Sequence, residues 1–459
     1  MYDVTLPQQS GQDRDSGAAR SGHSFATMRP LPLLIVATAL ATIGAATPAH
    51  AAPAEPDAIH TWRGDQPNER FGWAVSSLGD IDHDGVQEAI IGAARHTDDQ
   101  GRINGHTDVR SGRTGKLLHR FTGAPDDVHG YAMADAGDVN RDGVPDIVVG
   151  ATGEARLACS DTPRPGRIYV YSGRTGRELL KVDGEADGDQ FGAAVGAAGD
   201  VDRDGRADLL VGAPCHDGPA GADAGKAYVV SGRTGKVLRT HDGAEAGDAL
   251  GWGAAGLGDV TGDHRTDYIV GAKDAGPGDR GLAYVYDGRR GTTRFTLAGD
   301  EKSFDFGWFF VATAGRVDGD RVPDIYVGDF CGEDATDQCA LPAGQAYVFS
   351  GRTGQRLHLF RGEQPNDGAG PGRSAGDVDR DGRDDIAVGF YSSSAGAFQA
   401  GRLVVYSGRT GRILRDLRSS VANELLGYDA VGIGDVNRDG RVDLLVSAAG
   451  GDTVYVIGA

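Results

Sequence analysis

A unit of about 60 residues occurs seven times along this chain of 459 residues. Each copy contains an acidic segment that starts at a fixed anchor position, and successive anchors are separated by 58, 62, 59, 57, 61 and 58 residues. The anchors are Asp80, Asp138, Asp200, Asp259, Arg316, Asp377 and Asp435. Repeats of this length are supersecondary units that bury their apolar faces only against neighbouring copies. We therefore expect one repetitive domain over residues 52–459.

Each copy also contains short apolar runs that are typical of β-strands. Ala89-Ile90-Ile91 follows the first anchor, and Ile168-Tyr169-Val170-Tyr171 lies late in the second copy. Runs of four to six residues rich in Val, Ile and Tyr, bounded by Gly and Asp, indicate strands rather than helices. A Ser-Gly-Arg-Thr-Gly pentapeptide, typical of a tight hairpin, occurs at 111–115, 172–176, 231–235, 350–354 and 407–411. About four strands per copy predict an all-β, seven-bladed β-propeller of four-stranded antiparallel blades.

The two ends of the repeat region complement each other. The last copy stops after its third strand, at residues 453–457, whereas residues 59–64 match residues 118–123, the fourth strand of the first full copy. We expect the N-terminal strand to complete the last blade, because this closes the ring and hides two strand edges. A linear array is the alternative, but it does not explain why one end lacks what the other has.

The first 51 residues have the composition of a secretory signal peptide. An apolar run over residues 30–46 follows Arg29 and precedes the small-residue pattern Ala49-His50-Ala51, which are the parts of such a signal. Met28 is a second candidate initiator. A retained membrane anchor is the alternative, but the run is shorter than the roughly 20 residues that span a bilayer. The sequence therefore predicts a secreted, extracellular protein with no membrane span in its mature form.

Composition excludes several classes of protein. The net charge of -20 argues against a nucleic-acid partner, because such proteins need a basic face to displace counterions from phosphates. The 74 Gly residues show no strict triplet period, which excludes collagen. A hydrophobic fraction of 39% is enough to build a core and argues against general disorder.

The acidic segments have the pattern D-x-[DN]-x-D-G-x-x-[DE] in five copies. Four side-chain oxygens within nine residues, folded by a Gly, suit Ca²⁺, which takes six to eight oxygen ligands, whereas Mg²⁺ rarely accepts an all-protein cage. Plain Asp-Gly turns are the alternative, but turns need only one or two Asp, and crowded carboxylates repel one another without cations. We predict about five Ca²⁺ sites with these ligands: Asp80, Asp82, Asp84, Glu88, Asp138, Asn140, Asp142, Asp146, Asp200, Asp202, Asp204, Asp208, Asp377, Asp379, Asp381, Asp385, Asp435, Asn437, Asp439 and Asp443.

Two copies depart from this pattern. The fourth has His264 in the place of the Gly, and the fifth begins with Arg316 and has Arg321 in that place. A guanidinium in the fifth loop can pair with the acids that remain there and replace the metal by a salt bridge. The fourth loop keeps Asp259, Thr261, Asp263 and Asp267, and the fifth keeps Asp318, Asp320 and Asp324. We expect both sites to be weak or empty.

The first strand of several copies opens with Phe-Gly, at residues 71–72, 191–192 and 306–307, and Gly-Ala-Pro stands at 212–214. These motifs resemble the FG-GAP repeats of the integrin α-subunit N-terminal propeller, over essentially all of residues 57–459. The resemblance implies strand-flanked calcium loops and an adhesion-type module. The sixth copy departs from it, because Gly368–Gly372 replaces Phe-Gly, and the fifth has one extra residue before its anchor, which predicts a bulge.

An aromatic residue follows the first-strand Gly in most copies. First strands line the channel of a propeller, so these rings are expected to converge near one mouth of it. The positions are Trp73, Tyr131, Trp252, Trp308 and Tyr428, with Ala193 in the third copy. The resemblance implies that they form part of an aromatic cup for a cationic side chain, held by cation–π attraction. Plain packing of a narrow hub is the alternative, and the sequence leaves both open.

The four cysteines suggest two bridges. Cys159 and Cys215 lie in corresponding loops of neighbouring copies, and Cys331 and Cys339 lie in one loop. Because an exported protein meets oxidising conditions, we predict the pairs Cys159–Cys215 and Cys331–Cys339. Free thiols are the alternative.

No catalytic motif stands out among the twelve scattered His, since neither H-E-x-x-H nor a nucleophile elbow occurs. Arg63-Gly64-Asp65 spells an adhesion tripeptide, but its Gly belongs to the repeat, so chance explains it best. We predict no catalytic residues and a secreted, monomeric, calcium-binding module for an extracellular protein or glycan. The alternative is a secreted propeller enzyme that acts on polysaccharide or phosphodiester substrates through its long loops.

Overall fold

A computed structural model describes residues 58–153, 159, 162–330 and 343–458 of the chain. All of them belong to one compact unit, Ala52–Ala459. The predicted signal peptide over residues 1–51 and the predicted pair Cys331–Cys339 lie outside the described residues. The described residues form seven sheets of four antiparallel strands each, as predicted.

The blades are numbered from the first complete set of four strands. Blade 1 contains β2 (Phe71–Leu78), β3 (Glu88–Ala93), β4 (His106–Arg110) and β5 (Leu117–Thr122). Blade 2 contains β6 (His129–Gly137), β7 (Asp146–Ala151), β8 (Arg167–Tyr171) and β9 (Glu178–Asp183). Blade 3 contains β10 (Ala194–Gly199), β11 (Asp208–Ala213), β12 (Lys226–Val230) and β13 (Val237–Asp242). Blade 4 contains β14 (Leu250–Gly258), β15 (Asp267–Ala272), β16 (Leu282–Tyr286) and β17 (Thr293–Ala298).

The remaining blades follow the same order. Blade 5 contains β18 (Val311–Gly315), β19 (Asp324–Asp329), β20 (Gln345–Phe349) and β21 (Arg356–Arg361). Blade 6 contains β22 (Ala369–Gly376), β23 (Asp385–Phe390), β24 (Arg402–Tyr406) and β25 (Ile413–Arg418). Blade 7 contains β26 (Leu426–Gly434), β27 (Asp443–Ala448), β28 (Thr453–Ile457) and β1 (Ala58–Arg63), and the short 3₁₀ helix η2 (Ala449–Gly451) connects β27 to β28.

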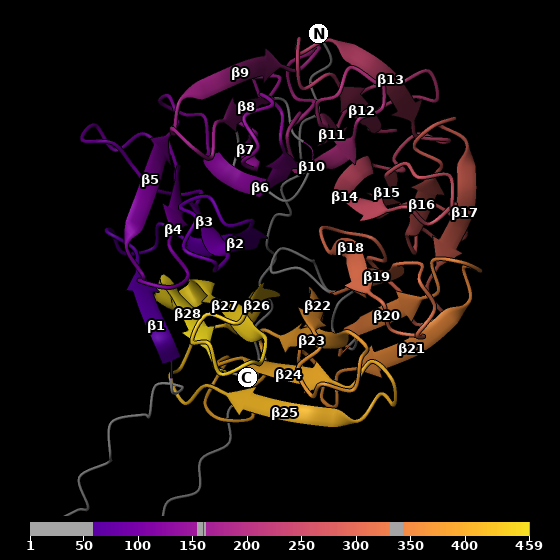
Figure 1. Ribbon diagram of the computed structural model, residues 1–459. Coiled ribbons are helices and arrows are strands. Elements are labelled where there is room, and N and C mark those ends of the chain that lie inside the picture. Colours follow the sequence, from indigo (N-terminus) through magenta and orange to yellow (C-terminus); the bar gives the residue numbers. More distant parts are fainter. Residues whose placement is uncertain (1–57, 154–158, 160–161, 331–342, 459) are drawn as a thin grey trace, which may run out of the picture. The chain divides into compact units, whose positions relative to one another are not determined.

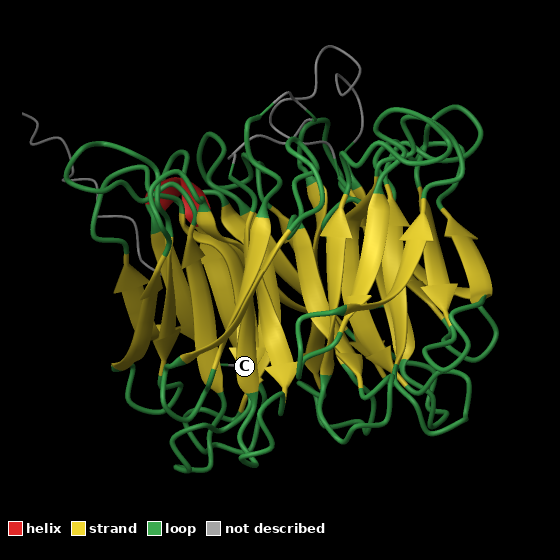
Figure 2. Cartoon of the chain, turned by 90° about the horizontal axis from the view of Figure 1, so that it is seen from above, coloured by secondary structure: helices red, strands yellow, loops and turns green. Residues whose placement is uncertain are grey.

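The first strand of each blade faces the centre of the ring and the fourth lies outside (Figure 1). Strands run between two layers of loops (Figure 2). We call one layer the acidic edge, because it holds the loops between first and second strands, together with the hairpins between third and fourth strands. The other layer, the linking edge, holds the loops between second and third strands and the links from blade to blade.

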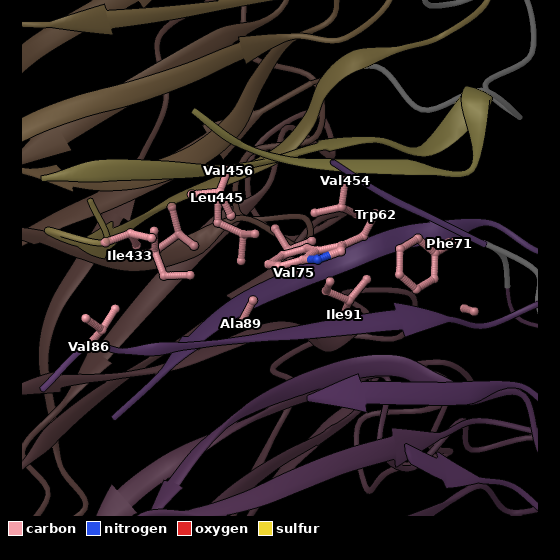
Figure 3. Packing of buried hydrophobic residues seen from close by; sticks show 13 residues of the cluster. Trp62, Phe71, Val75, Val86, Ala89, Ile91, Ile433, Leu445, Val454 and Val456 are labelled. Carbon is pink, nitrogen blue, oxygen red and sulfur yellow. The ribbon is translucent and has the colours of Figure 1, made fainter. Parts of the chain in front are cut away.

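The ring closes as the sequence predicts. β1 pairs antiparallel with β28, with Trp62 opposite Val454. Trp62 then packs with Phe71 and Ile91 of blade 1 and Leu445 of blade 7 in one buried cluster (Figure 3). Burial of side chains of this size contributes roughly 1.5–3 kcal/mol each, so the N-terminal strand is held by apolar packing as well as by backbone hydrogen bonds.

The core lies between neighbouring sheets. Second strands such as β7 and β11 are buried at every residue, and strands buried on both faces read as continuous apolar runs. Outer strands such as β13 carry no fully buried residue. The apolar second-strand runs therefore identify the middle of each blade.

Two local features bear on the site. A disulfide joins Cys159 to Cys215, which confirms that prediction and ties the linking-edge loops of blades 2 and 3. The extra residue of the fifth copy forms a tight turn before β18 and not a bulge within a strand pair. In this turn, Phe309 has a left-handed φ of 54°, and the N–H of Phe310 donates to the carbonyl of Trp308 at 2.6 Å. This turn directs the aromatic side chains of blade 5 toward the channel side of the molecule.

Candidate functional site

The acidic loops curl around the carboxylate at their first position. In blade 1, Asp80 accepts hydrogen bonds from the N–H groups of Asp84 at 3.1 Å and Gly85 at 2.8 Å. Gly85 has a φ of 87°, which a residue with a side chain rarely adopts. The same bond from the sixth-position Gly to the first-position Asp measures 2.9 Å in blade 2, 3.0 Å in blades 3 and 6, and 2.7 Å in blade 7.

Three of these loops bring carboxylate oxygens together. In blades 1, 3 and 6, oxygens from the first, third and ninth positions lie within 4.8 Å of one another. Oε2 of Glu88 and Oδ1 of Asp200 are buried and have no hydrogen-bond partner. Because buried acceptors are costly to leave unsatisfied, these loops fit a hard cation that takes oxygen ligands.

Burial also changes the proton affinity of the ninth position. It raises the pKa of Glu88 to about 8, and the neighbouring Asp82 and Asp80 add to the shift. Burial likewise raises the pKa of Asp208 and of Asp385 to about 6. A bound divalent cation opposes such shifts because it stabilises the ionised form.

The loops of blades 2 and 7 have Asn at the third position. The amide nitrogen of Asn140 donates to Asp146 at 3.0 Å, and that of Asn437 donates to Asp439 at 3.1 Å. To bind a cation, each amide must turn its oxygen toward the loop centre instead. These two loops therefore fit a cation only after an amide rotation.

The ninth-position Asp has a second role that its spacing did not reveal. In blade 3, Oδ2 of Asp208 accepts from the N–H of Val201 at 2.8 Å, and Oδ1 accepts from Gly232 of the Ser-Gly-Arg-Thr-Gly hairpin at 3.1 Å. Asp146, Asp267, Asp324 and Asp385 make the same pair of contacts. This carboxylate ties the acidic loop to the neighbouring hairpin, with or without a metal.

The fourth loop keeps the fold of the others. His264 takes a φ of 64° and donates its N–H to Asp259 at 2.8 Å, as the Gly does elsewhere. Oγ1 of Thr261 and Oδ2 of Asp263 are buried without a hydrogen-bond partner. Replacement of the Gly has therefore not altered the loop backbone, and weak or absent binding here stays a prediction.

The fifth loop does contain an ion pair, but with a different arginine from those expected. Asp320 pairs with Arg352 of the hairpin, at 2.6 Å, and no such pair with Arg316 or Arg321 is seen in the described residues. This pair is not particular to the fifth loop, because the equivalent hairpin arginine of blade 6, Arg409, pairs with Asp381 at 2.8 Å. The N–H of Arg316 instead donates to Asp384 of blade 6 at 2.7 Å.

The five predicted hub aromatics lie in one apolar cluster at the linking edge. Trp73 contacts Tyr131 and Tyr428 with ring centroids 5.7 and 5.5 Å apart, and Trp252 contacts Trp308 at 6.1 Å. Phe309 joins these two groups, at 6.2 Å from Tyr131 and 5.4 Å from Trp252. The cluster, which we call the aromatic hub, comprises Trp73, Tyr131, Trp252, Trp308, Phe309, Phe330, Tyr391 and Tyr428.

Three members of the hub were not singled out from the sequence. Phe309 is the extra residue of the fifth copy, and the irregular spacing there was the available signal. Phe330 and Tyr391 directly follow the second strands β19 and β23, where no repeated motif marks them.

Most of the hub is packed against itself. Trp252 is 0% exposed and Trp308 4%, whereas Phe309 and Tyr428 are half-buried. The ammonium of Lys273 already lies 5.2 Å from the ring centre of Trp308. Trp252 and Trp308 therefore contribute to packing, and Phe309 and Tyr428 are the rings that an outside group can reach.

The inner strands of all seven blades enclose a cavity of about 630 Å³. Trp73, Tyr131 and Tyr428 line it near the linking edge. Farther along the strands, Arg373 pairs with Asp429 at 2.6 Å. Asp135 of β6 also lines the cavity, and burial raises its pKa. The channel is thus apolar and aromatic at one end and carries a charge pair farther in.

Comparisons with known proteins agree with this architecture. A family model described as FG-GAP repeat matches residues 134–171 and 191–230. Integrin alpha-6 of Gallus gallus is 30% identical over 33% of this chain and 14% of its own length. Integrin alpha pat-2 of Caenorhabditis briggsae is 30% identical over 46% of this chain and 18% of its own length. Integrin alpha-PS2 of Drosophila melanogaster is 32% identical over 35% of this chain and 11% of its own length.

The matched segments thus span less than a fifth of each of these relatives. Within the described part of the chain, no helix is long and apolar enough to cross a membrane. The repeats that the sequence identified, the seven four-stranded blades and the similarity to several integrin α-subunits agree with one another. The chain is therefore a propeller that carries FG-GAP repeats and resembles integrin α-subunits over part of its length.

Proposed function

We propose that the chain is a secreted, calcium-loaded propeller that binds an extracellular protein or glycan at its linking edge. The observation that carries the proposal is the cavity of about 630 Å³, which is lined near the linking edge by aromatic rings, the half-buried Phe309 and Tyr428 among them. Cavities with an apolar lining and a few polar groups are the usual form of a ligand site.

Calcium has a structural part in this proposal. Cations in the acidic loops fix the turns between first and second strands, and so the position of each inner strand along the channel. Five Ca²⁺ would offset half of the net charge of -20. Affinities near 10⁻⁴–10⁻³ M, typical of extracellular modules, are expected.

The hub favours a ligand that carries a cation. Phe309 and Tyr428 offer partly exposed ring faces, and a cation over an aromatic ring gains roughly 0.5–2 kcal/mol. A basic side chain on a protein ligand meets this requirement. A glycan would instead stack a sugar face on the same rings, and the experiment below separates the two.

The test is a screen of extracellular proteins and glycans with calcium present, followed by binding measurements on single variants. Tyr428→Ala and Phe309→Ala are expected to weaken binding at least tenfold, with Phe295→Ala, an aromatic on the outer strand β17, as the matched control. Loss of binding on replacing one basic residue of a protein ligand supports the cationic mode. Unchanged affinity in both hub variants would exclude the hub as the site.

A further inference from the structure

Blade 1 contains a cluster of one acid and two histidines at its linking edge, away from the acidic loops. Glu69 lies in the link from β1 to β2, His96 follows β3, and His106 opens β4. One potential ligand atom from each lies within 4.8 Å of those of the other two. Glu69 and His106 are both 1% exposed, and His96 is half-buried.

Two buried polar atoms in this cluster have no hydrogen-bond partner. They are Oε2 of Glu69 and Nε2 of His106. Nε2 of His96 lies 3.9 Å from Oε2 of Glu69, and Oδ1 of Asp108 lies 3.8 Å from Nε2 of His106. These distances are too long for hydrogen bonds, and a buried acceptor facing a buried imidazole is costly without a shared partner.

Asp108 cannot supply that partner, because two guanidinium groups already hold it. Its oxygens accept from Arg120 at 2.6 and 2.8 Å and from Arg110 at 2.8 Å. The carboxylate is therefore neutralised within blade 1. Arg120 also forms an ion pair with Asp65, so guanidinium groups balance the charges of both Asp65 and Asp108.

The same position in other blades is satisfied by protein groups. In blade 7, Glu424 stands where Glu69 stands in blade 1, and it accepts from the hydroxyls of Tyr455 at 2.6 Å and Ser419. Tyr455 and Asp108 occupy equivalent places in the third strand, opposite Val446 and Ile91. Blade 1 has thus lost the hydroxyl donor and has two imidazoles beside the acid instead.

Blade 3 offers a second contrast. Its Asp189 accepts from Nδ1 of His216 at 2.9 Å, and Lys226 opens the third strand where His106 does in blade 1. Lys226 pairs with Glu185 at 2.9 Å. In blade 3 the acid and the residue that opens the third strand are thus both paired, although the hydroxyl of Tyr228 is buried without a hydrogen-bond partner. In blade 1 the corresponding acid and the residue that opens the third strand, Glu69 and His106, each keep an unpaired atom.

The imidazoles of blade 1 are set up as neutral ligands. Nδ1 of His96 lies 3.1 Å from the side-chain oxygen of Asn104, so it donates and leaves the lone pair on Nε2. Such a second hydrogen bond is the usual way in which a metal-binding His is oriented. Burial lowers the pKa of His106 to about 4, which keeps its ring neutral at physiological pH.

We propose that Glu69, His96 and His106 bind one divalent transition-metal ion of the Zn²⁺ type. Two imidazoles and a carboxylate are a common zinc ligand set, and water completes the coordination. Imidazole ligands disfavour Ca²⁺, which prefers oxygen. Ligand atoms around tetrahedral zinc lie roughly 3.4 Å apart at bond lengths of about 2.0–2.1 Å, so the pair His96–Glu69, now 3.9 Å apart, must approach only slightly on binding.

Such an ion would tie three segments that are separate in the sequence. The link that carries Glu69 joins the N-terminal strand β1 to blade 1, so the metal would lock the closure of the ring at its seam. The half-buried His96 gives the ion a path from solvent.

The test uses untagged full-length protein in excess calcium, so that the acidic loops are saturated. Zn²⁺ is titrated by calorimetry, bound metal is counted after dialysis, and Co²⁺ absorption reports tetrahedral geometry. We expect one zinc per chain and a higher melting temperature. Glu69→Gln and His106→Gln should abolish binding, and Asn104→Ala should weaken it 10–100-fold.

His216→Gln, in the equivalent place of blade 3, is the matched control and should bind zinc as the wild type does. His96→Gln replaces only a half-buried residue. It is the variant to measure if Glu69→Gln and His106→Gln, which replace buried residues, fail to fold. Absence of a stoichiometric zinc in the wild type, or equal zinc binding by His96→Gln and the wild type, would overturn the proposal.

Discussion

The third and fifth acidic loops have the same support and different ligands. In the third, Asp208 accepts from Val201 at 2.8 Å and from Gly232 at 3.1 Å. In the fifth, Asp324 accepts from Val317 and Gly351 at the same distances. The third loop begins with Asp200, whereas the fifth begins with Arg316, which offers no carboxylate.

This difference separates two roles that the repeated motif combines. The ninth-position carboxylate accepts hydrogen bonds from backbone N–H groups. It is present in the fifth loop, which has no carboxylate at its first position. In the proposed calcium site of the third loop, Asp200 at the first position would bind the cation, and without the cation it already accepts from the N–H of Gly205 at 3.0 Å. The contacts of the ninth-position carboxylate are therefore present even in a loop that has no carboxylate at its first position.

The largest effect is expected from removal of the ninth-position carboxylate. Asp208→Ala and Asp324→Ala each leave buried N–H groups without an acceptor, and each such donor costs about 1–3 kcal/mol. We expect losses of about 3 kcal/mol or more in both loops, measured by urea unfolding with calcium present. Asp204→Ala, which loses the bond from the N–H of Arg206 and a 3.8 Å pair with Arg233, is the control, and it is measured in chelator because Asp204 is also a predicted calcium ligand. Equal stability of Asp324→Ala and the wild type would contradict the shared role.

The next effect separates the loops by their calcium dependence. Asp200→Ala should lower the melting temperature more with calcium than with chelator, where it loses only the bond from the N–H of Gly205. Arg316→Ala keeps the N–H that bonds Asp384, so it should change the melting temperature little, and by the same amount in both conditions. A ligand at 100 times its dissociation constant stabilises a protein by about 2.7 kcal/mol, which sets the scale for one loop. Melting curves of both variants in the two conditions measure the difference, and an equal calcium response would remove the distinction.

The features that follow from the repeat register could be predicted from the sequence. The blades, the closure by residues 59–63 and the Cys159–Cys215 bridge all depend on which residues occupy equivalent places, and the spacing shows this directly. Contacts between non-equivalent places could not be predicted. Phe309, for example, enters the hub because an insertion turns the backbone.

The same reason explains why Glu69, His96 and His106 were not noticed. Each is unremarkable in its own segment, and the relation among them exists only where three segments meet. A comparison of blades would have given one signal, since Asp108 replaces the Tyr found at 169, 228, 284, 347 and 455. For the calcium loops, by contrast, all the ligands lie within nine residues, so a linear pattern contains most of the geometry.

A smaller effect is expected from rebuilding the fifth loop. Arg316→Asp with Arg321→Gly restores the first ligand and the residue that permits a positive φ at the sixth position. Calcium binding should then rise by one ion per chain, as counted by equilibrium dialysis. Asp320 must exchange its partner Arg352 for the ion, which reduces the gain in stability. The single variant Arg321→Gly is the control, and an unchanged calcium count in the double variant would show that more than these two positions were lost.

The smallest expected effect is a pH dependence that calcium removes from one loop and not from the other. Burial raises the pKa of Asp324 to about 6, above the usual value of 3.8. The folded state then binds more protons than the unfolded state between these values, so the free energy of unfolding falls as pH rises from about 4 to about 6. Asp208 has the same shift, also to about 6, but a cation in the third loop would hold it ionised. The quantity to measure is the difference in unfolding free energy between the wild type and each Asn variant over this pH range. For Asp324→Asn, this difference should change with pH whether or not calcium is present. For Asp208→Asn, it should change with pH only in chelator. If calcium changed the two pH profiles in the same way, the two loops would bind calcium alike. The distinction between the third and fifth loops, which is based on Arg316 at the first position, would then fail.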